Sequence, residues 1–221
     1  MEPIWLSIRL AIITTIFLLF IGIPIAYWLS RKQTVFKIIT EALITMPLVL
    51  PPSVLGFYLL LAFSPNNGLG KWLHHYFDLQ LVFSFNGLIL ASIIYSLPFM
   101  VSPIKAAFSH LPRSLAEASY VMGKSKWKTF FYVLLPNVKP SIFTAAVLTF
   151  AHTLGEFGVV LMIGGNIPGE TKVASIAIYD AVETMDYHSA NSYALILFAI
   201  TFIIVIMVFL INRNAIKSPF E

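Results

Sequence analysis

The chain has 221 residues, of which 58% are hydrophobic and only 11% are charged. Soluble domains carry about a quarter charged residues, so this composition indicates a membrane protein. There is no cysteine, which excludes disulfides, thiolate metal sites and thiol nucleophiles.

Five apolar stretches are long enough to cross a bilayer as helices, which takes about 20 mostly apolar residues. They cover residues 5–29, 38–62, 85–104, 141–163 and 192–211. The first is too long for the core of a signal peptide and has neither a basic leader nor a small-residue cleavage site, so we expect it to be retained. The sequence therefore predicts an all-α polytopic protein with five transmembrane helices in a single membrane domain over 1–221.

The basic residues are distributed unevenly between the two sides of these spans. Eleven of the 14 Lys and Arg residues fall on one side: Arg31, Lys32, Lys37, Lys105, Arg113, Lys124, Lys126, Lys128, Lys139, Arg213 and Lys217. The other side receives Lys71 and Lys172, and Arg9 lies inside the first span. Because cytoplasmic loops are enriched in Lys and Arg, we expect the N-terminus outside and the C-terminus in the cytoplasm.

The second stretch contains Pro47, Pro51 and Pro52 within six residues. Proline lacks a backbone donor and clashes with the preceding turn, so this helix is expected to kink or break. Irregular backbone at membrane depth is tolerated only against protein or water, which makes a pore-lining position one interpretation. A packing kink against a neighbouring helix is the other.

The loop between the third and fourth spans, about 111–136, has the pattern of two short helices. Leu111, Leu115, Ala118 and Met122 share one helical face, and Gly123 suits the left-handed residue that stops a helix. A second short helix would then begin at a Ser125 cap and end at Pro136. Periodicity alone leaves open a simple amphipathic pair lying in the lipid headgroups.

The spacing within this loop resembles the "EAA" signature of ABC-importer permeases, E-A-A-x3-G-x9-I-x-L-P. The matching residues are Glu117, Ala118, Ser119, Gly123, Val133, Leu135 and Pro136, with Ser119 in place of the second Ala and Val133 in place of Ile. The resemblance implies that this segment is a coupling helix that docks on a separate cytoplasmic ATPase. The chain has no phosphate-binding glycine loop of the Walker type, so it is not expected to hydrolyse ATP by that route.

The fourth span is interrupted by Gly155, Glu156 and Gly158, with His152 one turn before the glutamate. An ionisable residue inside a span indicates a functional role. A catalytic zinc site needs about three protein ligands, and no further ligand lies at suitable spacing, so an intramembrane metalloenzyme is disfavoured. A carboxylate would repel an anion in a pore, so we expect Glu156 to be a structural or gate residue, paired with Arg9 at a similar depth.

The external connection at 164–191 is expected to hold a short helix over 171–181. Asn166, Glu170 and Asp186 are weak candidates for a docking surface, and an ordinary solvated loop is the alternative.

The sequences PLVLPPSVLGFYLLL, LGEFG and GGNIPGET closely resemble the molybdate branch of the ABC-importer permeases. The resemblance implies a homodimer with two cytoplasmic ATPase subunits and an extracytoplasmic oxyanion-binding protein, in the cell membrane and without nucleic acid. It implies no cofactor bound by this chain, because ATP and magnesium belong to the partner ATPase, and no enzymatic activity of its own. The sulfate branch is similar around the fourth span, and tungstate permeases are also relatives, so sulfate and tungstate are alternative substrates. An ion-coupled secondary transporter is a further alternative, although such folds usually show internal repeats, which are not evident here.

Overall fold

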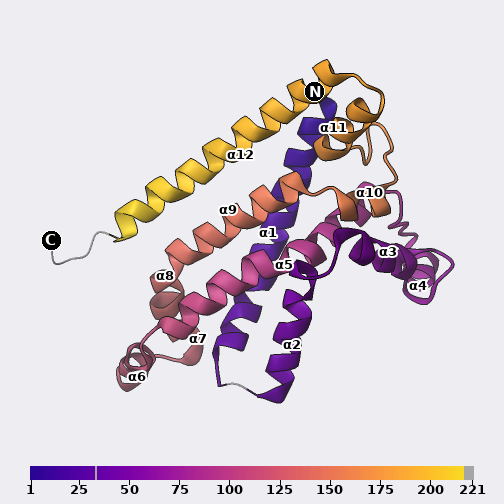
Figure 1. The fold of residues 1–221 in the computed structure, drawn as a ribbon. Coiled ribbons are helices and arrows are strands. Elements are labelled where there is room, and N and C mark those ends of the chain that lie inside the picture. The colour runs from indigo at the N-terminus through magenta and orange to yellow at the C-terminus, as the bar shows by residue number, and fades with distance from the viewer. Residues whose placement is uncertain (33, 217–221) are drawn as a thin grey trace.

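The computed structural model describes residues 1–32 and 34–216, and within these ranges the regular secondary structure is helical (Figure 1). Lys217, part of the predicted basic tail, lies outside the described residues. The elements in chain order are α1 (Glu2–Ser30), α2 (Val35–Thr45), the 3₁₀ turn η1 (Met46–Leu48), α3 (Pro52–Phe63), α4 (Gly68–Phe77), α5 (Phe85–His110), α6 (Arg113–Val121), α7 (Lys126–Thr129), the π-helix η2 (Phe130–Leu134), α8 (Leu135–Asn137), α9 (Lys139–Gly155), α10 (Gly158–Gly164), α11 (Ala174–Glu183) and α12 (Tyr187–Ile216).

The centre of the protein is formed by α1, α5 and α9, which pack on one another. Gly22 of α1 lies so close to α5 that a Cβ atom there would be 2.6 Å from Cγ of Met100. The hydroxyls of Ser96 on α5 and Thr153 on α9 are buried and lie 3.0 Å apart. Small residues and interhelical hydrogen bonds are the usual means by which membrane helices associate, so this trio has the packing expected within a bilayer.

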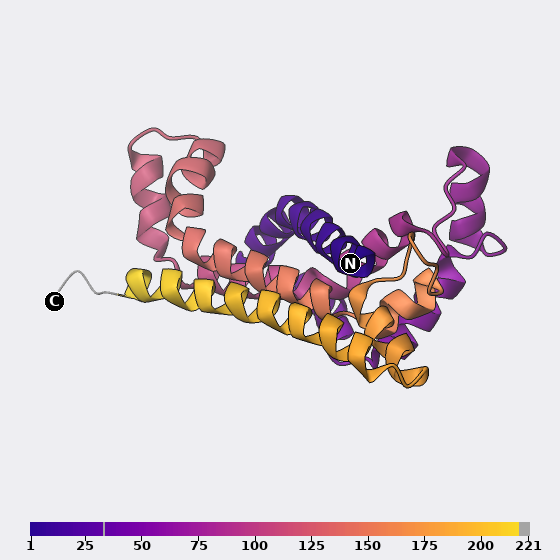
Figure 2. The same ribbon diagram turned by 90° about the horizontal axis from the view of Figure 1, so that it is seen from above.

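Three of the five predicted spans are single helices long and apolar enough to cross a membrane, namely α1, α5 and α12. The α5 helix continues past the predicted end at 104, so Lys105 belongs to the helix and not to the following loop; its ammonium group forms an ion pair with Glu41 of α2. Figure 2 shows α12 running along α9 at one side of the molecule, and its apolar window is almost entirely exposed.

The other two predicted spans are broken. Residues 38–62 divide into α2 with η1 and then α3, and the two parts meet at 112° around the prolines. The predicted span at 141–163 stops at Gly155 and resumes as α10, while its N-terminal end meets the α7–α8 region at 70°. The break predicted from Pro47, Pro51 and Pro52 is present, and so is the predicted interruption at Gly155 to Gly158. The bend of 70° at the start of α9 is the feature that the sequence did not predict.

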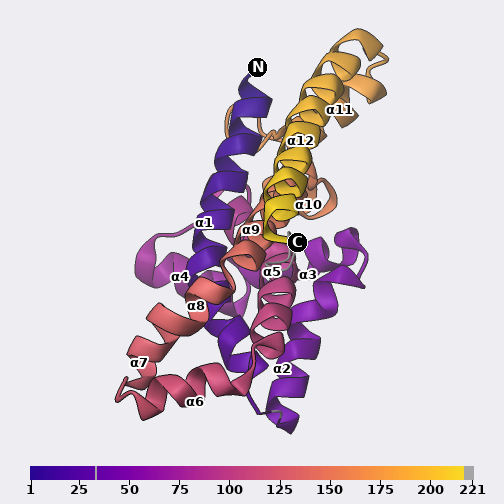
Figure 3. The same ribbon diagram turned by 90° about the vertical axis from the view of Figure 1, so that its left-hand side faces the viewer.

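The two ends of the molecule carry different elements. The N-terminus and α11 lie at one end, and α2, α6 and α7 lie at the other, as Figures 1 and 3 agree. The α6–α7 region extends away from the helical core (Figure 2). The turn after α1, with Arg31 and Lys32, lies at the α6–α7 end, so the basic connections gather there.

Candidate translocation and coupling sites

The two broken helices meet. Gly158, the first residue of α10, lies against Pro52, the first residue of α3; a Cβ atom at Gly158 would be 2.7 Å from the Pro52 Cβ. A Cβ atom at Gly56 of α3 would be 2.9 Å from the Cβ of Met162 on α10. The sequence indicates the two interruptions separately, and the fold places them side by side.

Glu156 determines how the fourth span is interrupted. It follows the last residue of α9 with an extended backbone, and its Oε1 accepts a 3.0 Å hydrogen bond from the Val159 amide at the start of α10. The backbone carbonyl of Glu156 accepts a 2.5 Å hydrogen bond from the Ser175 hydroxyl of α11. Glu156 lies one residue before Phe157, the N-cap of α10, and by accepting the Val159 amide its carboxylate caps one of the free amides at the helix start.

A cavity of about 480 Å³ opens beside this break, and Pro52, Tyr95, His152, Gly155, Glu156 and Gly158 are among the residues that line it. The His152 ring stacks on Phe99 at 3.9 Å and on Tyr95 at 4.8 Å between centroids. Its Nε2 lies 3.9 Å from Oε2 of Glu156 and has no hydrogen-bond partner. The described residues contain no group of three or more His, Cys, Asp or Glu arranged to hold a metal.

Arg9 is not part of this cluster. Its guanidinium carbon lies 4.8 Å above the centre of the Phe85 ring, and the ion pairs found among the described residues do not join it to Glu156. Similar depth along two helices does not fix which faces they turn to each other, and the Glu156 carboxylate turns back to its own backbone. The expected Arg9–Glu156 pair is therefore absent from this structure. Pro47 is likewise elsewhere, buried within η1 beside α5.

The segment with the coupling signature forms two helices joined by a tight turn, as predicted. Gly123 follows α6 with φ +75°, the left-handed conformation that glycine adopts without strain. The Ser125 hydroxyl accepts the Lys128 amide at 3.3 Å and caps α7. Glu117 is exposed and lines a cavity of about 630 Å³ with Arg31, Lys32 and Arg113.

One expectation for this segment is wrong in detail. The chain continues as helix through Pro136, and the bend comes at Val138 instead, because proline is tolerated in the first turn of the short α8. On the apolar face of α6 that the sequence indicates, Ala118 and Met122 are exposed, whereas the neighbouring Ser119 is buried. Val121 and Met122 are 89% and 73% exposed at the turn, which leaves an apolar tip facing solvent.

The predicted short helix in the external connection is present as α11. Asn166 donates to both carboxylate oxygens of Asp180, at 2.9 and 3.0 Å, and Lys172 pairs with the same carboxylate at 2.5 Å. Partial burial acts to raise the pKa of Asp180, but the hydrogen bonds from Lys172 and Asn166 outweigh it and hold the pKa below its usual value. Hydrogen bonds from Ser189 similarly lower the pKa of Asp186.

Several residues at these sites carried no signal in the sequence. Tyr95 and Ser175 come from helices distant in sequence, and Ser7 of α1 accepts the buried Ala174 amide at 2.8 Å, which fixes the start of α11. Single hydroxyls in apolar helices have no recognisable spacing, so only the fold could identify them.

Comparison with known proteins identifies the family. Residues 9–217 match the family described as "Binding-protein-dependent transport system inner membrane component". The chain belongs to this family of membrane permeases. The resemblance to ABC-importer permeases inferred from the coupling signature is thereby confirmed.

Individual relatives agree with this assignment. The chain is 46% identical over 192 residues to the molybdenum transport system permease protein ModB of Azotobacter vinelandii, covering 86% of this chain and 84% of the relative. It is 30% identical to the sulfate transport system permease protein CysT of Escherichia coli, covering 95% and 74%. A bacterial ABC transporter involved in alginate import superposes with a TM-score of 0.78 at 17% identity, over 98% of this chain and 79% of that one, which supports the fold.

Proposed function

We propose that the chain is the permease subunit of an ABC importer that carries molybdate across the cytoplasmic membrane, driven by ATP hydrolysis on a separate subunit. The observation that carries this proposal is the 46% identity to a ModB permease over most of both chains, together with the meeting of the two broken helices at Pro52 and Gly158. The weaker 30% identity to a sulfate permease makes sulfate the second candidate substrate. Tungstate has the same tetrahedral dianionic shape.

We further propose that the α6–Gly123–α7 segment couples the permease to its ATPase. The exposed tip at Val121 and Met122 supports this proposal, because solvent-exposed apolar residues beside a rigid turn suit a protein contact. Glu117, Ala118, Ser119 and Gly123 would form the joint, with Val133, Leu135 and Pro136 linking it to α9. Rigid-body motion of the ATPases would thus reach the helices that hold the pore.

The assembly we propose is a homodimer with two ATPase subunits, which hold the ATP and magnesium, and an extracytoplasmic binding protein. The basic end with α6 and α7 would face the cytoplasm, and α11 would face outward. Pro51, Pro52, Gly155, Glu156 and Gly158 would form a gate in the path. Glu156 acts there as a cap, and oxyanion selectivity rests mainly on the binding protein.

Uptake of labelled molybdate tests the proposal, in cells whose only oxyanion importer is this complex. We expect unlabelled tungstate to compete with molybdate for uptake and sulfate to compete poorly. In inverted membrane vesicles, we expect molybdate transport to require ATP. Equal competition by sulfate would reassign the substrate to sulfate. Uptake that follows an ion gradient without the ATPase would overturn the coupling mechanism.

A further inference from the structure

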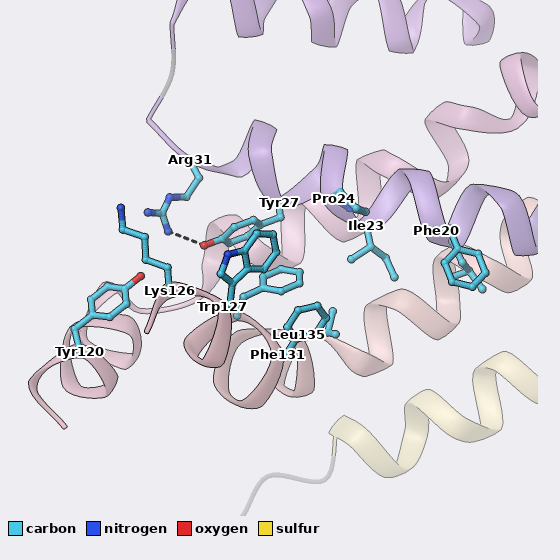
Figure 4. Close-up of a pocket in the computed structure, with 12 residues that line it drawn as sticks. Phe20, Ile23, Pro24, Tyr27, Arg31, Tyr120, Lys126, Trp127, Phe131 and Leu135 are labelled. Carbon is cyan, nitrogen blue, oxygen red and sulfur yellow. Dashed lines mark hydrogen bonds between the residues drawn. The ribbon is translucent and has the colours of Figure 1, made fainter. Parts of the chain in front are cut away.

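A long groove separates the second half of α1 from the coupling segment. Its volume is about 780 Å³, and it is lined on one side by α1 and on the other by α7, η2 and α8 (Figure 4). Phe20, Ile23 and Pro24 of α1 face Phe131 and Leu135 across it. From Phe20 to Arg31 the groove follows about 16 Å of helix axis, at 1.5 Å per residue. We call it the α1 groove.

Two cations stand at one end of the α1 groove. Figure 4 shows Arg31 and Lys126 at the Tyr27 end, with Phe20 at the opposite end. The Arg31 guanidinium donates a 2.9 Å hydrogen bond to the Tyr27 hydroxyl, which holds it in place while leaving most of its five donors for another group. In the described part of the chain, no ion pair involves Arg31 or Lys126.

The charge around this end is predominantly positive. Arg31 also borders the neighbouring cavity, where Lys32, Arg113 and Glu117 are found, so the single carboxylate is outnumbered. Trp127, 75% exposed, and Tyr120 add amphipathic rings beside the cations. Aromatic rings and basic residues together are typical of the headgroup level of a membrane.

The wall contributed by the coupling segment is irregular. Residues Phe130–Leu134 form a π-helix, and both Phe130 and Phe131 line the groove. Single π-helical turns are rare and often occur at functional sites.

We propose that the α1 groove binds one anionic phospholipid, with its phosphate against Arg31 and Lys126 and an acyl chain along the apolar walls toward Phe20. Such a lipid has a negative charge to pair with the two cations and an apolar chain to fill the rest of the groove. A free anion lacks the apolar chain, and a neutral lipid lacks the net negative charge. If the proposed coupling role is right, on which this consequence rests, the lipid joins α1 to the coupling segment and makes transport sensitive to anionic lipid.

Native mass spectrometry of the purified, delipidated full chain tests the site. The chain is titrated with phosphatidylglycerol or phosphatidylcholine of identical acyl chains. Because each basic residue near an anionic headgroup strengthens binding, two of them correspond to roughly a 30-fold preference for phosphatidylglycerol over phosphatidylcholine. We expect this preference in the unmodified chain and its loss in the Arg31→Gln/Lys126→Gln variant. The Lys124→Gln/Lys139→Gln variant removes the same amount of charge from exposed positions outside the groove. It should keep the preference for phosphatidylglycerol.

A photoactivatable phosphatidylglycerol gives a second readout that needs no variant, and its crosslinks should map to α1 near Phe20–Arg31 or to Lys126–Leu135. Equal binding of both lipids, or equal loss in the two variants, would overturn the proposal. A chain dimer that dissociates only in the Arg31→Gln/Lys126→Gln variant would show that a second copy fills the groove instead. Neither measurement involves substrate or ATPase. A negative result for lipid binding is therefore distinct from a failure of the proposed transport function.

Discussion

The hydroxyl of Ser119 on α6 lies 2.9 Å from that of Thr129 at the end of α7, and both are buried. Ser119 stands where the coupling signature has alanine, a replacement that looks conservative from the sequence. In the fold it makes a buried side-chain hydrogen bond across the Gly123 turn, and so joins the two arms of the coupling segment.

Replacing Ser119 with alanine should therefore loosen the coupling segment. The Thr129 hydroxyl would lose its partner in a buried position, which costs about 1–3 kcal/mol. Amide hydrogen exchange across residues 113–135 should become faster, and molybdate uptake should fall. The Ser119→Ala/Thr129→Val variant removes both hydroxyls and should recover slow exchange. Ser114→Ala, at an exposed position of α6, is the control; an equal effect there would contradict the role of the bond.

Gly123 provides a second test of the same turn. A Cβ atom at this position would meet nothing within 4 Å, so only the backbone conformation at φ +75° resists substitution. Gly123→Ala should cost about 1–2 kcal/mol and reduce uptake, whereas Gly123→Asn should cost less, since asparagine tolerates the left-handed region. Proline cannot adopt this φ and should abolish uptake.

Gly68→Ala is the matched control for the turn, because a Cβ atom there also meets open space and its φ is not in the left-handed region. Uptake by cells expressing equal amounts of each variant is the measurement. If Gly123→Ala and Gly68→Ala transport equally well, the turn is not under conformational constraint and the coupling interpretation loses its support.

The features of the fold and the site that the sequence could predict are those that depend on residues close together in the chain. The turn at Gly123, the cap at Ser125 and the break at Pro51 and Pro52 follow from local rules, and all three are present. Contacts between distant segments do not follow from such rules. Nothing in the sequence places Pro52 against Gly158, turns Arg9 toward Phe85, or brings Ser175 to the Glu156 carbonyl.

The charge of Glu156 and its capping function can be separated by two substitutions. Glu156→Gln keeps a side-chain oxygen that can accept the Val159 amide, whereas Glu156→Ala removes the cap and should destabilise the α9–α10 junction by about 1–2 kcal/mol. If the residue serves as a cap, uptake should survive in the glutamine variant and fall in the alanine variant. An equal loss in both would show that the negative charge itself is required.

Arg9 should act independently of Glu156. A double-mutant cycle between Arg9→Ala and Glu156→Ala, read from unfolding in detergent, should be additive within about 0.5 kcal/mol. The cycle between Arg9→Ala and Phe85→Leu should instead show a coupling of about 0.5–1 kcal/mol, because the guanidinium lies over that ring. A coupling found only in the first cycle would restore the ion pair that the sequence suggested.

The network around Asp180 predicts that the stability of the α11 end depends on pH. The pKa of Asp180 is lower in the folded protein than its usual 3.8, so the stability it contributes is fully present above the usual value. That contribution is lost as the pH falls through the lower, folded value. At pH 7, Asp180→Asn should lower stability by about 1 kcal/mol, since it removes the partner of Lys172.

Thermal unfolding in detergent between pH 7 and pH 3 measures this effect. The difference in unfolding temperature between the unmodified chain and the Asp180→Asn variant should be constant from pH 7 to about pH 5 and shrink below pH 4. Glu170→Gln, an exposed substitution in the same connection, should leave the curve unchanged. A difference that persists undiminished at the acidic end would mean that the network is held by the Asn166 contact and the shape of the side chain, and not by the charge on Asp180.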